Sequence, residues 1–169
     1  CLYTHPEVVL AALREVLVAE AGRVVLGDAP IQGCDWNRLV TDAFRARVEE
    51  VASGFDATVS FVDFRRTTLT RRLGVDHVAT DRRESDRYVL FDLGRDSILE
   101  EISTYENRFR VGDYDPDELA KTHRPGVHQF LMCREAFEAD VVLSLPKLKT
   151  HCKVGLTGAL KNLVGLNGN

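Results

Sequence analysis

The chain has 169 residues, 44% of them hydrophobic and 28% charged, a composition typical of a globular protein with a real core. Its formal net charge of −4 argues against a nucleic-acid-binding protein, because such proteins carry a basic surface. No apolar run reaches about 18 residues and no signal peptide is present, so we expect a cytoplasmic protein with no membrane partner.

The first half of the chain alternates helix and strand. Thr4 and Glu7 form a capping box, Pro6 fits the first helical turn, and Asp35 can cap a second helix. The predicted elements are a helix over 4–22, a strand over 23–27, a helix over 35–54 and a strand over 57–64. This order predicts a parallel sheet.

Residues 65–87 break this rhythm, since they contain seven arginines and four acids but few large apolar side chains. A solvated loop or hairpin is the simplest interpretation, and a substrate-facing insertion is the alternative. The elements predicted after it are a strand over 88–94, a short helix over 96–102, a strand over 106–111, a short helix starting at Asp115-Pro116, a strand over 128–133, a helical turn over 134–139, a buried strand over 140–145 and a helix over 154–165.

These elements predict an α/β fold. We expect a mostly parallel sheet flanked by helices on both faces, in three layers, with an irregular Arg-rich insertion around 65–87. Residues 1–169 are expected to form a single α/β domain. Because the chain begins at Cys1 without a methionine and stops just after a predicted helix, we expect it to be a fragment of a longer protein.

Four of the five lysines lie within fifteen residues, and no acidic residue follows Asp140. They are Lys147, Lys149, Lys153 and Lys161. If residues 147–153 run extended, the first three of these lysines and His151 point to one side. The helix predicted to follow would add amino-terminal N–H groups that attract anions. This stretch therefore predicts a site for a phosphate or a carboxylate, although a solvated basic rim would give the same pattern.

Two residues are candidates for catalysis at this site. His151 can transfer a proton, and Asp28 follows the strand over 23–27, at the carboxyl end where ligands of open α/β sheets bind. Asp28 could pair with a lysine, act as a base or hold a cation. Cys34 is an alternative nucleophile, because a nearby helix start lowers a thiol pKa.

Several common sites are not indicated. The chain has neither a Walker motif nor a G-x-G-x-x-G motif, and its five histidines lack H-E-x-x-H spacing. His123 and His128 flank a turn, and two histidines alone do not predict a metal site. The four cysteines are widely spaced, which favours free thiols over disulfides or an iron–sulfur cluster.

The stretch ADVVLSLPKLKTHCKVGLTGALKNLVGLNG, residues 139–168, resembles the signature of the domain-of-unknown-function family 362, DUF362. The stretches VVLGDAPIQGCDW (24–36) and HQFLMCREAFEADVV (128–142) are also similar to that family, so the resemblance covers most of the chain. Some members carry a ferredoxin-like segment, but this chain lacks such a cysteine run, so any [4Fe-4S] cluster would lie outside it. The family pattern adds Thr150 and Asn162 to the motif and gives no residue an established role.

The sequence thus leaves three functions open, and neither the cofactor nor the oligomeric state follows from it. The first is an enzyme or binding domain for an anionic small molecule. The second is a redox-associated domain working with an iron–sulfur module outside this chain, and the third is a non-catalytic module that docks an acidic partner. For the first, we expect binding by Lys147, Lys149, Thr150, Lys153, Lys161 and Asn162, with His151 and Asp28 transferring protons.

Overall fold

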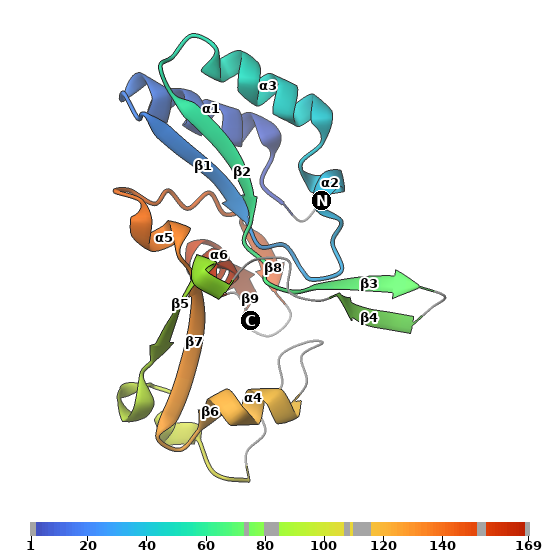
Figure 1. The fold of residues 1–169 in the computed structure, drawn as a ribbon, viewed down its shortest axis with the longest axis vertical. Coiled ribbons are helices and arrows are strands. Elements are labelled where there is room, and N and C mark those ends of the chain that lie inside the picture. Colours follow the sequence, from blue (N-terminus) through green and yellow to red (C-terminus); the bar gives the residue numbers. More distant parts are fainter. Residues whose placement is uncertain are drawn as a thin grey trace.

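The computed structural model describes residues 3–72, 75–79, 85–106, 109, 116–151 and 155–167. Its order along the chain begins with α1 (Pro6–Val18), β1 (Arg23–Asp28), α2 (Trp36–Leu39), α3 (Asp42–Ala52) and β2 (Thr58–Asp63). A hairpin of β3 (Thr68–Arg72) and β4 (Val75–Ala79) follows, and it projects away from the remaining elements (Figure 1). A hairpin is one of the two forms expected for the Arg-rich insertion.

The parallel pair β1–β2 carries the largest hydrophobic cluster. Its strands run in register from Arg23 opposite Thr58 to Asp28 opposite Asp63. Both α1 and α3 pack on one face of this pair (Figure 1). The cluster consists of Leu10, Leu13, Leu17 and Val48, against which Val24, Leu26, Val59 and Phe61 pack. Because strand side chains alternate, these four strand residues share the face that the helices cover.

The helices differ from their predicted bounds at the caps. His5 caps α1 by accepting a hydrogen bond from the Glu7 N–H, whereas Thr4 donates its hydroxyl hydrogen to the Leu145 carbonyl. The predicted capping box of Thr4 is therefore wrong. Asp35 caps α2 as predicted, but the helix expected over 35–54 is broken, because the Thr41 hydroxyl accepts from the Phe44 N–H and starts α3.

The second half of the chain contains antiparallel sheets. The strand β5 (Tyr88–Asp92) pairs with β7 (Val127–Cys133), which also pairs with β6 (His123–Arg124). The helix α4 (Pro116–Thr122) begins at the predicted proline, and α5 (Glu135–Glu138) is a single helical turn as predicted. The region expected as a helix over 96–102 forms two 3-10 turns, Gly94–Asp96 and Glu100–Ile102. Most of the strand expected over 106–111 lies outside the described residues.

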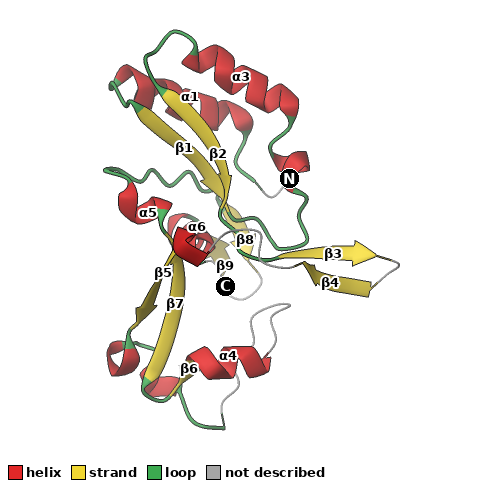
Figure 2. Cartoon of the chain, in the orientation of Figure 1, coloured by secondary structure: helices red, strands yellow, loops and turns green. Residues whose placement is uncertain are grey.

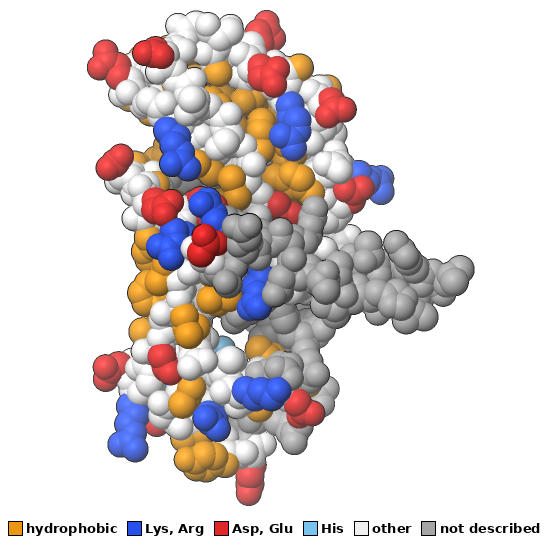
Figure 3. Space-filling view, in the orientation of Figure 1, with side chains coloured by type: hydrophobic (Ala, Val, Ile, Leu, Met, Phe, Trp, Pro, Cys, Tyr) orange, Lys and Arg blue, Asp and Glu red, His pale blue; other side chains and the backbone are white. Residues whose placement is uncertain are grey.

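The α/β class is confirmed, but the mostly parallel, three-layer sheet is wrong. The described strands form one parallel pair and antiparallel sheets of two or three strands. In β5 Tyr88 is buried, but the end of the strand is exposed, including Leu90 (59%) and Phe91 (37%). Figure 3 shows hydrophobic side chains along the edge of the molecule beside β5. Sequence pattern predicts that a segment is extended, but it does not set the direction of its partner.

The segment 140–145 is not the buried strand that its apolar sequence predicts. It forms no strand, and Val141, Val142 and Leu143 are 72%, 50% and 58% exposed. Figure 2 shows the chain between α5 and β8 as loop. It pairs with no described strand. Two hydrogen bonds from side chains hold it, one from the Thr4 hydroxyl to the Leu145 carbonyl and one from the Asn162 amide to the Ser144 hydroxyl.

The end of the chain folds as a hairpin before its helix. The hairpin pairs β8 (Lys149–His151) with β9 (Gly155–Thr157), and α6 (Ala159–Leu163) continues into a 3-10 turn over Val164–Leu166. The helix predicted over 154–165 therefore starts five residues late. Gly155 has a φ of 74°, in the left-handed region, so the chain turns there and no helix begins.

Candidate functional site

The lysine-rich motif lies on the β8–β9 hairpin. Lys149 pairs with Thr157 across the hairpin, and the buried Thr157 hydroxyl donates to the Lys149 carbonyl at 3.4 Å. Because β8 is extended, Lys149 and His151 project from one side of the strand and Thr150 from the other. The extended conformation on which the predicted one-sided arrangement depends is thus confirmed for residues 149–151. Lys153 lies outside the described residues.

His151 is in direct contact with a second lysine of the motif. The Lys161 Nζ lies 2.6 Å from the His151 Nε2. An ammonium group can only donate hydrogen bonds, so Nε2 accepts and the imidazole carries its own proton on Nδ1. Lys161 thereby fixes the tautomer of His151, and two side chains that can each be cationic lie side by side.

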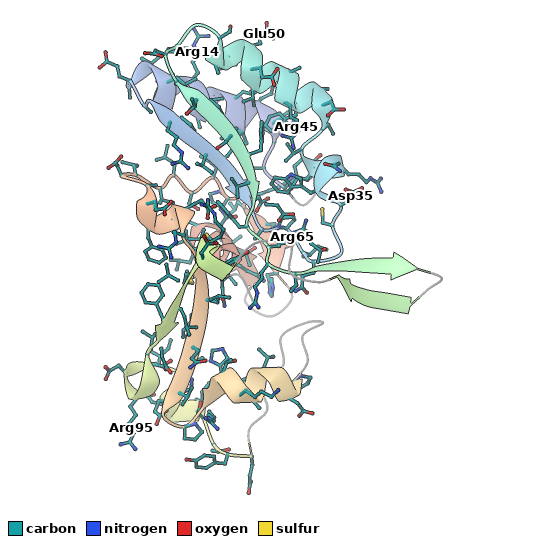
Figure 4. The ribbon with its side chains drawn as sticks, viewed as in Figure 1. Arg14, Asp35, Arg45, Glu50, Arg65 and Arg95 are labelled. Atoms are coloured by element: carbon teal, nitrogen blue, oxygen red, sulfur yellow. The ribbon has the colours of Figure 1, made fainter. Side chains whose placement is uncertain are left out.

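Asp28 lies at the carboxyl end of β1, beside a network built at the end of β2. The Asp63 carboxylate accepts from Arg65 at 2.9 Å (Nε) and 2.7 Å (Nη2). The Arg65 Nη1 donates to three carbonyls of the loop after β1, those of Ile31, Gln32 and Cys34, at 3.0, 3.2 and 2.8 Å. Figure 4 shows Arg65 where the chain leaves β2. Arg65 thus fastens the β1 loop to the end of β2.

The environment of Asp28 raises the pKa of its carboxyl group above the ordinary value of 3.8. Its side chain still reaches solvent, but the protein atoms packed around it displace much of the hydrating water. This burial raises the pKa of the Asp28 carboxyl, while the Ala29 N–H and the charges of Arg65 and Lys149 oppose the rise. Lys149 is therefore close enough to act electrostatically on Asp28, and the two loops singled out from the sequence come together.

Close packing between the two halves of the chain fixes this arrangement. A Cβ on Gly165, just after α6, would lie 3.1 Å from the Ala29 Cβ. A larger residue at position 165 would therefore require the β1 loop or this turn to shift by a few tenths of an ångström. Asn162 donates to the Ser144 hydroxyl at 3.1 Å, which ties α6 to the segment before Pro146. The carboxyl-terminal motif therefore packs against the residue that follows Asp28.

One expected part of the site is wrong. The helix start that would complete an anion cradle is absent from this position, because α6 has five residues and begins only at Ala159, after the whole β8–β9 hairpin. Its cap is Gly158, which has no side chain to cap the helix. Any anion binding at the motif would therefore come from the lysines and His151 and not from a helix dipole.

A family comparison matches residues 74–169, more than half of the chain, to the domain of unknown function DUF362. The chain belongs to the DUF362 family. The match contains the whole Pro146–Asn162 motif, as the sequence resemblance predicted, but residues 24–36 lie outside it.

A curated relative of this DUF362 chain is Thylakoid-associated protein sll1697 of Synechocystis. The two are 40% identical over 57 residues, which make up 34% of this chain and 16% of the relative. The matched region thus spans about one sixth of the relative's length. No solved structure matches the chain.

Other candidate sites are weaker in the described part of this DUF362 chain. It contains no cluster of three or more His, Cys, Asp or Glu side chains arranged to hold a metal ion. Cys34 contacts the Asp35 carbonyl at 3.6 Å and no described histidine. None of the helices in the described ranges combines the length and the apolar character needed to cross a bilayer.

Sequence reasoning missed the residues that assemble the site. Asp63 and Arg65 were placed in a strand and in a solvated insertion, and Gly165 in a helix. A charged Asp-Phe-Arg directly after an apolar strand is the signal that could have located the first two, because the carboxyl ends of parallel strands meet at one edge.

Proposed function

We propose that this DUF362 domain binds an anionic small molecule, a phosphate or a carboxylate. The site consists of Pro146–His151, Lys161 and the carboxyl end of β1. The observation that carries the proposal is the 2.6 Å contact between Lys161 Nζ and His151 Nε2. Protonation of His151 would place two positive charges together, in a stretch that has no acid after Asp140. A bound anion would offset that repulsion.

The same groups give the site a means of proton transfer. Lys161 can pass a proton from its Nζ to the His151 Nε2 while the Nδ1 proton leaves for a ligand, so that the imidazole stays neutral and Lys161 becomes an uncharged amine. Asp28 has a raised pKa, which brings it nearer the range in which a carboxyl group exchanges protons efficiently. We therefore assign anion binding to Lys147, Lys149 and Lys161, with Thr150 and Asn162 beside them, and proton transfer to His151 and Asp28.

Inorganic phosphate tests the binding proposal. Phosphate at a hundredfold excess over its Kd should raise the melting temperature by roughly 5 to 10 °C. The double variant Lys147→Ala/Lys149→Ala should lose this rise, because both ammonium groups leave the loop. Lys121→Ala is the matched control, since Lys121 is the one lysine of the sequence outside the cluster, and it should keep the rise.

Sodium chloride at the same ionic strength separates recognition of phosphate from screening of the lysines. A double variant that responds to phosphate as the parent protein does would reject the proposal, as would a parent protein that responds equally to the two salts.

A further inference from the structure

Two carboxylates lie side by side at the carboxyl end of the parallel pair, and they differ in their hydrogen-bond partners. Asp28 is the last residue of β1 and Asp63 the last of β2, and the two are register partners. Like charges this close are unfavourable unless a cation or a hydrogen-bond donor compensates them. The groups that compensate each carboxylate therefore show which of the two can still accept a hydrogen bond from a ligand.

Asp63 is fully compensated. Its two oxygens accept from Arg65 Nε and Nη2, and Oδ1 also accepts from the Arg65 N–H at 3.1 Å. Arg65 is itself fully engaged, because its Nη1 donates to three loop carbonyls and its side chain is 4% exposed. Neither partner can turn toward Asp28 or toward a ligand without breaking this network.

Asp28 is compensated only in part. The Ala29 N–H donates to it, and Arg65 and Lys149 act on it through their charge, but no described side chain hydrogen-bonds to its carboxylate. The carboxylate is still accessible from solvent. An acceptor group thus remains open at the edge of a site whose other polar members, the lysines and His151, offer hydrogens.

We infer that the ligand is an anion that carries a hydroxyl group beside its charged group, a hydroxy acid or a hydroxylated phosphate ester. Asp28 accepts the hydroxyl hydrogen while Lys149 and Lys147 hold the anionic group. An ammonium group would also satisfy Asp28, but the neighbouring lysines would repel it. This inference rests on the proposed function and specifies its ligand class.

Paired ligands that differ only in their hydroxyl groups test it by calorimetric titration: glycolate against acetate, and glycerol 3-phosphate against propyl phosphate. In at least one pair the hydroxylated member should bind about tenfold tighter, the effect of one hydrogen bond to a charged acceptor. The pair that responds also distinguishes a carboxylate from a phosphate as the anionic group.

Asp28→Asn should abolish the preference and leave acetate and propyl phosphate bound at least as tightly, because a negative charge has left the site. Asp56→Asn, at an exposed aspartate before β2, is the matched control and should keep the preference. Lys149→Ala should weaken all four ligands. If Asp28→Asn fails to fold, as judged by circular dichroism, Asp28→Ser replaces it.

Equal binding of both members of each pair to the parent protein, with all binding still dependent on Lys149, would overturn this inference and leave the proposed function standing. A preference for hydroxylated ligands that persists without the Asp28 carboxylate would overturn it too. The absence of binding by any of the four anions would reject the proposed function, and this inference with it.

Discussion

Arg65 shows how a single residue positions the candidate site. Its side chain is almost completely buried, and its guanidinium bonds both oxygens of Asp63 and three carbonyls of the loop after β1. A buried charge persists only where its hydrogen-bonding groups are satisfied. Arg65 therefore determines where the loop after Asp28 lies.

Arg65→Met should lower the free energy of unfolding by about 3 to 5 kcal/mol, because it leaves Asp63 as a charge without its partner and three carbonyls without their donor. Urea denaturation measures the change. The exposed Arg38 provides the control, since Arg38→Met should change stability by no more than about 0.5 kcal/mol. Equal stabilities of the two variants would show that Arg65 does not hold the loop.

At the scale of the elements, a histidine pair joins β6 and β7. His128 is completely buried and its Nε2 lies 3.1 Å from Glu100 Oε2, which also accepts from the Gly126 N–H at 2.8 Å. The His123 ring stacks on the His128 ring with centroids 5.9 Å apart. Burial lowers the pKa of His123, and the charge of His128 acts in the same direction.

Acid should therefore weaken this sheet. Since the folded-state pKa of His123 lies below its ordinary value of 6.5, the unfolded chain binds the proton first, and stability is lost as the pH falls from about 6.5 toward the folded pKa. The pKa of Glu100 is also lowered, chiefly by the Gly126 N–H, so a further loss follows below its ordinary value of 4.5. The His123 and Glu100 contributions therefore both lower the free energy of unfolding as the pH falls.

His123→Phe should reduce the fall in melting temperature between about pH 6.5 and 5, because phenylalanine takes no proton. His5→Asn, at the exposed cap of α1, should retain the slope of the parent protein. Melting curves measured by circular dichroism across this range provide the comparison. A His123→Phe slope as steep as that of the parent would show that another group causes the acid sensitivity.

At the scale of the whole molecule, the site exists only because two distant parts of the chain meet. The parallel pair supplies Asp28, the carboxyl-terminal motif supplies the lysines and His151, and the contact between Ala29 and Gly165 brings them together. Much of the apolar surface next to the motif is exposed, including Leu148 (67%), Leu156 (60%) and Leu160 (86%). The packing of the carboxyl-terminal motif against the parallel pair therefore depends on a few close contacts and not on an extensive core.

Gly165→Ala tests this dependence. The new Cβ would lie 3.1 Å from the Ala29 Cβ, so the turn after α6 must move away, at about 1 to 3 kcal/mol of folding stability, and phosphate should bind less tightly. In Gly158→Ala the new Cβ would meet only the Leu148 side chain at 3.5 Å, an ordinary contact. Calorimetric titration compares the phosphate affinities of the two variants. Equal affinities would show that the contact between Gly165 and Ala29 does not affect phosphate binding.

Local patterns in the sequence predicted the helices and strands whose stability depends on neighbours in sequence. They located β1, β2, α4 and α5, and they placed Lys149 and His151 on one side of an extended segment. They failed at residues 140–145, because an apolar run indicates burial but does not specify the element against which it packs. They also failed at residues 155–158, because a hairpin competes with a helix where Gly155 permits the turn. Asp63 and Arg65 were missed for the same reason: their importance depends on a loop more than thirty residues away.

The hydrogen bond from Thr4 to the Leu145 carbonyl has a practical consequence for the bench. It holds Thr4 against Leu145, two residues before Lys147, so a segment joined to the chain directly before Thr4 starts beside the lysine-rich loop. A polyhistidine tag placed there would bring imidazoles and any nickel they carry within reach of the groups under test. Ligand titrations are best interpreted with that tag removed.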